Sequence, residues 1–186
     1  MKKTFTLILG LIIGNAIFAQ SIDQKVNDLL KKMTLEEKIG QLNQYTGFQF
    51  VTGPQNPNSV GILKEIKEGK VGSMLNVMGT KETTQFQKLA LQTRLKIPLL
   101  FGLDVIHGYK TTFPIPLAES CSWDLGMMEK SARVAAIEAS ASGVHWTFAP
   151  MVDVARDARW GRVMEGAGED TYLGSEIAKS RIKGFQ

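Results

Sequence analysis

The residues with the densest functional chemistry lie between positions 149 and 170, a stretch that we call the arginine loop. It holds three arginines, five carboxylates and three glycines. A short apolar run, residues 144–148, precedes it, and a helical pattern from Thr171 follows it. Connections of this length inside a compact domain are usually functional. Its charged groups need partners, which are either one another or a polar ligand.

A second polar group follows another apolar run. Asp104 comes directly after residues 97–103, which have the composition of a buried strand. A carboxylate and a guanidinium that face one cavity can bind vicinal hydroxyl groups, because Asp accepts two hydrogen bonds and Arg donates several in a fixed fork. This chemistry suits a sugar better than an apolar ligand.

Structural roles compete with this interpretation. Asp104 has the position of a helix cap or a turn residue after a strand. Trp160 can stack on a sugar ring, or it can pack beneath the neighbouring arginines. Alternating charges at close spacing usually pair with one another and stiffen a loop. Four residues of the arginine loop have that spacing: Asp153, Arg156, Asp157 and Arg159.

The sequence does not indicate a metal, a cofactor or a serine nucleophile. His107 and His145 are its only histidines, and no cysteine stands near either of them. His145 falls inside the apolar run of residues 144–148, where a buried, hydrogen-bonded histidine is expected. The acidic stretch lacks the alternating ligands of a calcium loop. No serine stands in a Gly-x-Ser-x-Gly elbow.

Composition and charge exclude several classes of protein. The 186 residues are 44% hydrophobic and 22% charged, which is typical of a globular protein. The formal charge is +4, and two of these charges belong to Lys2 and Lys3 near the N-terminus. So small a charge predicts neither a nucleic-acid partner nor a membrane surface. Cys121 is the only cysteine, so no intrachain disulfide is possible.

The first nineteen residues have the pattern of a secretory signal peptide. The two lysines form a basic segment, residues 5–13 form an apolar segment, and Ala16–Ala19 is a small-residue cleavage site. We therefore expect a mature protein that begins near Gln20, is exported and leaves the membrane after cleavage. A periplasmic location is the most direct interpretation.

The remaining sequence alternates strands and helices. Apolar periodicity predicts helices over 22–33, 34–42, 80–96, 127–142 and 171–183, and strands over 71–77, 97–103 and 144–148. Thr34 and Glu37 have the spacing of a capping box, and residues 47–61 are expected to form a loop. Serial alternation predicts a parallel α/β sheet, either doubly wound or closed into a barrel.

A TIM-type (β/α)8 barrel fits better than a doubly wound sheet. A doubly wound dinucleotide fold would carry a glycine-rich phosphate turn after its first strand, and residues 77–80 contain one glycine. A complete barrel takes roughly 250 residues. About three βα units are predicted here, so the chain is expected to hold only the N-terminal part of a barrel.

Several motifs resemble glycoside hydrolase family 3, and in particular its periplasmic bacterial β-glucosidases. The resemblance extends from the segment that opens the domain through the arginine loop. Ala158 stands where the family usually has proline, which affects the stiffness of the loop more than its chemistry. The matching segments are Thr34–Gln41, Gly102–Gly108, Phe113–Pro114, Thr147–Pro150, Arg156–Arg162 and Gly168–Asp170.

The resemblance implies an exo-acting, retaining β-glucosidase that releases terminal β-linked glucose from β-glucosides or oligosaccharides. Asp104 and Arg162 match two residues that bind the non-reducing-end sugar. A retaining glycosidase needs two carboxylates about 5–5.5 Å apart, one as nucleophile and one as acid/base. By the resemblance both lie beyond Gln186, so residues 20–186 are the N-terminal portion of the barrel domain and residues 1–186 alone are predicted to be inactive.

Other functions remain open at this point. The same family includes β-xylosidases and β-N-acetylglucosaminidases, although the latter generally lack the Arg159–Arg162 motif and are often cytoplasmic. A non-catalytic carbohydrate-binding remnant is the alternative from a different class. Sugar preference depends on residues outside this chain.

Overall fold

The computed structural model describes residues 20–47 and 59–186. The chain divides into two compact units, residues 1–34 and 35–186, and each is described by itself. The first contains helix α1 (Ile22–Lys32), which confirms the predicted helix over 22–33. Its N-terminus carries a capping box, because Ser21 Oγ accepts from Gln24 N at 3.2 Å and Ser21 N donates to Gln24 Oε1 at 3.1 Å. The predicted signal peptide lies outside the described residues.

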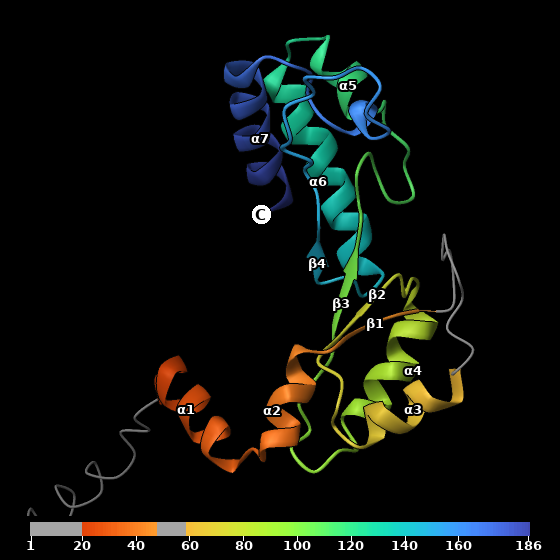
Figure 1. The fold of residues 1–186 in the computed structure, drawn as a ribbon, viewed down its shortest axis with the longest axis vertical. Coiled ribbons are helices and arrows are strands. Elements are labelled where there is room, and N and C mark those ends of the chain that lie inside the picture. Colours follow the sequence, from red (N-terminus) through yellow and green to blue (C-terminus); the bar gives the residue numbers. More distant parts are fainter. Residues whose placement is uncertain (1–19, 48–58) are drawn as a thin grey trace, which may run out of the picture. The chain divides into compact units, whose positions relative to one another are not determined.

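The second unit is an α/β fold built on a parallel sheet (Figure 1). The order of its strands is β1-β2-β3-β4, which is their order in the chain, and each neighbouring pair is parallel. A doubly wound sheet reverses its strand order at a switch point, whereas a TIM-type barrel does not. The sequential order is therefore that of part of a barrel. The elements are α2 (Leu35–Leu42), β1 (Gln44–Thr46), α3 (Ser59–Lys67), β2 (Ser73–Leu75), α4 (Thr80–Ala90), β3 (Leu100–Leu103), α5 (Pro116–Ser120), α6 (Leu125–Ala141), β4 (Trp146–Thr147), the 3-10 turn η1 (Val163–Glu165) and α7 (Thr171–Phe185).

The structure corrects the predicted strand count and several boundaries. Strand β1 is an additional strand, and its three residues lie beside Ser73–Leu75 of β2. Its sequence, Gln-Tyr-Thr, carries too little apolar character to predict a strand by itself. Helix α3 begins inside the predicted loop over 47–61, and α4 ends at Ala90 instead of Lys96. Helix α5 was not predicted, although its Pro116 occupies a first-turn position that tolerates proline.

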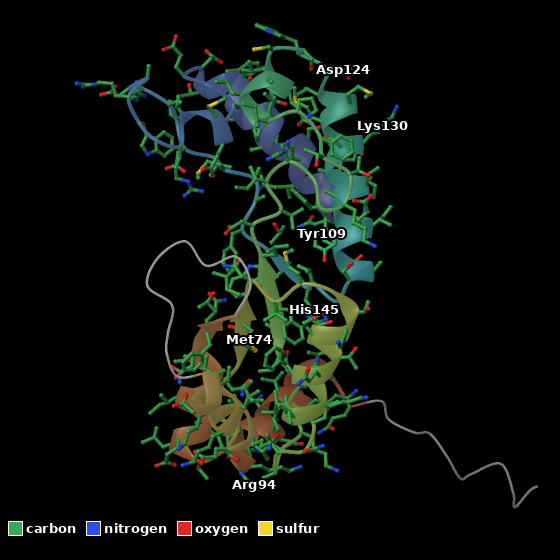
Figure 2. All side chains as sticks on the ribbon, turned by 90° about the vertical axis from the view of Figure 1, so that its right-hand side faces the viewer. Met74, Arg94, Tyr109, Asp124, Lys130 and His145 are labelled. Atoms are coloured by element: carbon green, nitrogen blue, oxygen red, sulfur yellow. The ribbon has the colours of Figure 1, made fainter. Side chains whose placement is uncertain are left out.

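One core lies between the sheet and helices α3 and α4. Met74 of β2, labelled in Figure 2, is fully buried, and Phe101 of β3 is 1% exposed. Gln87 of α4 satisfies the backbone groups of Leu99, directly before β3. Its Oε1 accepts from Leu99 N at 2.8 Å, and its Nε2 donates to Leu99 O at 3.3 Å. The core is completed by residues of these helices and of the segments flanking the strands: Ile62, Ile66, Val71, Val77, Phe86 and Ala90.

A second core lies beneath the ends of β3 and β4. Buried alanines of α6, Ala135 and Ala139, pack against Val105 and Val144, and Phe185 of α7 covers them. Helices α6 and α7 lie side by side (Figure 1). A Cβ at Gly184 would stand 2.3 Å from the Glu129 carbonyl oxygen, so only glycine permits this approach of the two helices. The second core thus supports the segment that follows β3, through Val105, and the entry to β4, through Val144.

None of the helices within 20–47 and 59–186 has both the length and the apolar character that a transmembrane span requires.

Candidate functional site

The loops that follow β3 and β4 begin side by side. Leu103 pairs with Thr147 in the parallel ladder, and Phe148 N donates to Leu103 O at 3.4 Å. Thr147 Oγ1 accepts from Val105 N at 3.3 Å, which ties the first loop to the last residue of β4. Asp104 is exposed at this edge, between half-buried Leu103 and buried Val105. We call residues 104–115 the β3 loop.

Arg162 of the arginine loop is held by Glu165 in a bidentate ion pair. Its Nε donates to Glu165 Oε1 at 3.0 Å, and its Nη2 donates to Oε2 at 2.6 Å. The hydrogen bond to Glu165 raises the pKa of Arg162 above its usual value, and the negative charges of Glu165, Asp104 and Asp153 raise it further, against the opposing effect of burial. Asp104 is thus one of the carboxylates whose charge acts on Arg162. The family resemblance predicts both residues as sugar ligands.

The other charges of the arginine loop form one local pair rather than a network. Arg159 donates through Nε to Asp157 Oδ1 at 3.0 Å and through Nη2 to Asp157 Oδ2 at 2.7 Å. The Arg159 side chain holds the pKa of Asp157 below its usual range, and the Arg159 backbone N–H adds to the effect. In the described part of the chain no hydrogen bond or ion pair engages the side chains of Asp153 and Arg156. Trp160 is half-buried.

The β3 loop is fastened to helix α6 by Glu138. The Glu138 carboxylate accepts from Lys110 N and Thr111 N at 2.8 Å and from Thr111 Oγ1 at 2.7 Å. These bonds, the Thr111 hydroxyl first, hold the pKa of Glu138 below its usual range. A Cβ at Gly108 (φ +117°) would stand 1.9 Å from the Thr111 carbonyl oxygen, so the tight turn requires glycine. The loop therefore has a defined conformation.

One of the two histidines, His145, differs from the sequence prediction in its burial. His145 is exposed and lies just before β4, whereas the sequence predicted a buried strand residue. Its Nδ1 accepts from Phe101 N at 3.2 Å and its ring stacks on Phe101, so the ring covers the ladder at the sheet edge. His107 is half-buried, with its Nδ1 3.0 Å from Phe113 O. Among the described residues no group of three or more His, Cys, Asp or Glu side chains gathers in a metal-binding arrangement.

Arg181 of α7 is a site-supporting residue that the sequence prediction missed. Its side chain is only 4% exposed, and its Nη1 lies 2.5 Å from Oε2 of Glu119, which is 10% exposed. Its Nη2 donates to the carbonyl oxygen of Ile106, within the β3 loop. Burial lowers the pKa of Arg181, and the charge and hydrogen bond of Glu119 oppose that shift. The available signal was its position four residues after Ile177, on the same helix face.

Comparison with known proteins gives a consistent result. The profile of the glycosyl hydrolase family 3 N-terminal domain matches residues 34–186. The periplasmic β-glucosidase of Salmonella typhimurium is 46% identical over 88% of this chain, and a putative β-xylosidase of Formosa agariphila is 31% identical over 89%. The chain spans about a fifth of the length of the first relative, 21%, and 24% of the second.

Solved structures of a Listeria innocua β-glucosidase have the same fold in this region. Its complex with isofagomine superposes with a TM-score of 0.79 at 45% identity, covering 89% of this chain and 23% of that one. The same enzyme has been crystallised with glucose, and a mutant of it with laminaribiose, at TM-scores of 0.78 and 0.77.

Proposed function

The chain belongs to glycosyl hydrolase family 3, and on that premise we propose that it supplies part of the sugar-binding wall of an exo-acting, retaining β-glucosidase. The observation that carries the proposal is the placement of Asp104 directly after β3 and of Arg162 in the loop that follows the adjacent strand β4, with the charge of Asp104 among those that raise the pKa of Arg162. Barrel enzymes place their sites on the loops at this end of the strands. The crystallised complexes of the Listeria enzyme with glucose and laminaribiose are in keeping with such a substrate.

The two residues have complementary roles in this proposal. The Asp104 carboxylate accepts hydrogen bonds from two sugar hydroxyls, and Arg162 donates to a hydroxyl oxygen. Glu165 occupies Nε and Nη2 of Arg162, and within the described residues no hydrogen bond engages Nη1, which remains available to a ligand. Such bonds accelerate hydrolysis if they tighten as the ring distorts toward the transition state. We assign neither the nucleophile nor the acid/base to a residue of this chain.

The test is hydrolysis of p-nitrophenyl β-glucoside by the complete product of the gene. Asp104→Ala and Arg162→Ala are each expected to lower kcat/KM about 10- to 100-fold, the effect of losing one or two charge-assisted hydrogen bonds. Lys179→Ala is the matched control, because Lys179 also pairs with a glutamate three residues away but lies on α7, outside both loops. Wild-type activity in both alanine variants contradicts the assignment of these residues.

A β-xylosidase is the second candidate, since the Formosa relative is described as one. The ratio of kcat/KM for p-nitrophenyl β-glucoside and β-xyloside separates the two, because xylose lacks the hydroxymethyl group of glucose. A product that binds glucose without hydrolysing either substrate is instead a carbohydrate-binding remnant.

We also propose that residues 1–19 are a signal peptide and that the mature protein is periplasmic. The support is the N-terminal sequence pattern and the similarity to a periplasmic enzyme of Salmonella typhimurium. The intact mass of the protein recovered from the periplasmic fraction should correspond to a chain that begins at Gln20. An unprocessed N-terminus in that protein would overturn the assignment.

A further inference from the structure

The contacts of Arg181 join helix α5 to the β3 loop. Its Nη1 donates to Oε2 of Glu119 in α5, at 2.5 Å, and its Nη2 donates to the carbonyl oxygen of Ile106 in the β3 loop. Its remaining nitrogen, Nε, is buried without a hydrogen-bond partner. The rigid fork of arginine suits this geometry, since it holds two acceptors in fixed directions at once.

Helix α7 carries Arg181 to this position with little freedom. Ser180 Oγ donates to Leu125 O of α6, and Gly184 lies against the backbone of Glu129 on the same helix. These two contacts lie on either side of Arg181 along α7. The helix begins directly after the arginine loop, where Asp170 Oδ1 accepts from Leu173 N at 2.7 Å. One helix thus ends the loop of Arg162 and contacts the loop of Asp104.

The Ile106 contact completes the restraint of Asp104. Before Asp104 in the chain, Leu103 is held in the ladder with β4, and directly after it Val105 N donates to Thr147 Oγ1. One residue further along, the Ile106 carbonyl is fixed by Arg181. Asp104 itself is exposed, so its direction is set by these neighbouring backbone contacts rather than by packing of its own side chain.

A contribution to folding stability does not explain why an ion pair is buried at this position. Apolar residues of similar volume usually serve as well or better at such positions, because desolvation offsets the attraction between the charges. What apolar residues cannot supply is a donor for the Ile106 carbonyl.

We propose that Arg181 is a positioning residue, which fixes the β3 loop through Ile106 so that the Asp104 carboxylate meets the sugar in the direction set by Arg162. This inference rests on the proposed function. It assigns to the proposed sugar site a supporting residue that does not itself touch the substrate.

The decisive variant is the double substitution Arg181→Met with Glu119→Leu in the complete gene product. It removes the ion pair without leaving a charge unpaired, so the unfolding midpoint in urea should stay near that of the wild type. The KM for p-nitrophenyl β-glucoside should rise about tenfold, as expected when the sugar bonds of Asp104 weaken. Backbone amides of residues 104–108 should exchange hydrogen faster, as measured by mass spectrometry. Lys183→Met is the control, since Lys183 also lies on α7 and pairs with a glutamate of a neighbouring helix, Glu129 of α6, but is exposed.

The outcomes separate the two proposals. A folded double variant with wild-type KM and wild-type exchange in residues 104–108 overturns the role of Arg181. If the double variant does not fold, Arg181→Lys decides: it keeps the charge beside Glu119 but lacks the fork, so wild-type KM and exchange in it also overturn the role. A wild-type protein that neither binds nor hydrolyses the glucoside contradicts the proposed function instead.

Discussion

Two arginine–carboxylate pairs of the second unit have the same charges but different surroundings. The Arg181–Glu119 pair is buried beneath the β3 loop, with side chains 4% and 10% exposed, whereas the Arg159–Asp157 pair in the arginine loop is 90% and 53% exposed. Charges in water interact weakly and are screened by salt, while buried charges cannot be left without a partner. The first pair therefore fixes backbone geometry, and the second remains free to rearrange around a ligand.

The largest effect is expected from breaking the buried pair on one side only. Arg181→Met leaves Glu119 buried without its partner, and removal of one member of a buried pair typically costs about 3–5 kcal/mol of unfolding free energy. Urea denaturation of the complete gene product measures this loss. Arg159→Met is the matched control in the exposed pair, and it should lower the midpoint only slightly. Equal effects of the two substitutions would remove the distinction between the pairs.

The smallest effect is expected from acid titration of the exposed pair. Arg159 lowers the pKa of Asp157 below its usual value of 3.8, so the pair stabilises the folded state above that pH and loses its contribution as the pH falls through the lowered pKa. Asp157→Asn should therefore reduce stability slightly at pH 6 and not at pH 2. The measurement is the unfolding midpoint of both proteins at the two pH values.

Asp153→Asn serves as the control for this titration. It removes a carboxylate of the same loop that accepts no hydrogen bond from a guanidinium within the described residues. A pH-independent difference between Asp157→Asn and the wild type would show that the pair contributes through packing instead of charge.

Much of the candidate site could be predicted from the sequence. Asp104 was singled out because it follows an apolar strand at the end where barrel sites lie, and Arg162 was singled out through the resemblance to the family. Two glutamates of the site were not predicted as partners: Glu165, which binds Arg162, and Glu138, which binds the backbone of the β3 loop. Nothing in their spacing distinguishes a glutamate that binds a loop backbone from one that faces solvent.

In the fold, too, some elements were predicted from the sequence and others were missed. Helices α1, α6 and α7 were predicted closely, since amphipathic periodicity over several turns is a strong local signal. Strand β1 was missed because three residues with one aromatic side chain become a strand only through the ladder with β2. His145 was expected to be buried because its neighbours are apolar, yet it is exposed beside Phe101.

The sequence by itself determined the class of fold, the helices with long periodic patterns and the residue types available for binding a polar ligand. These follow from local propensity and from the alternation of apolar and polar groups along the chain. Only the tertiary structure decided which charges are buried, which carboxylate holds which donor and that Arg181 reaches the loop of Asp104. Such pairings join residues up to 75 positions apart, as Arg181 and Ile106 are, and the approach of distant segments depends on how the whole unit packs.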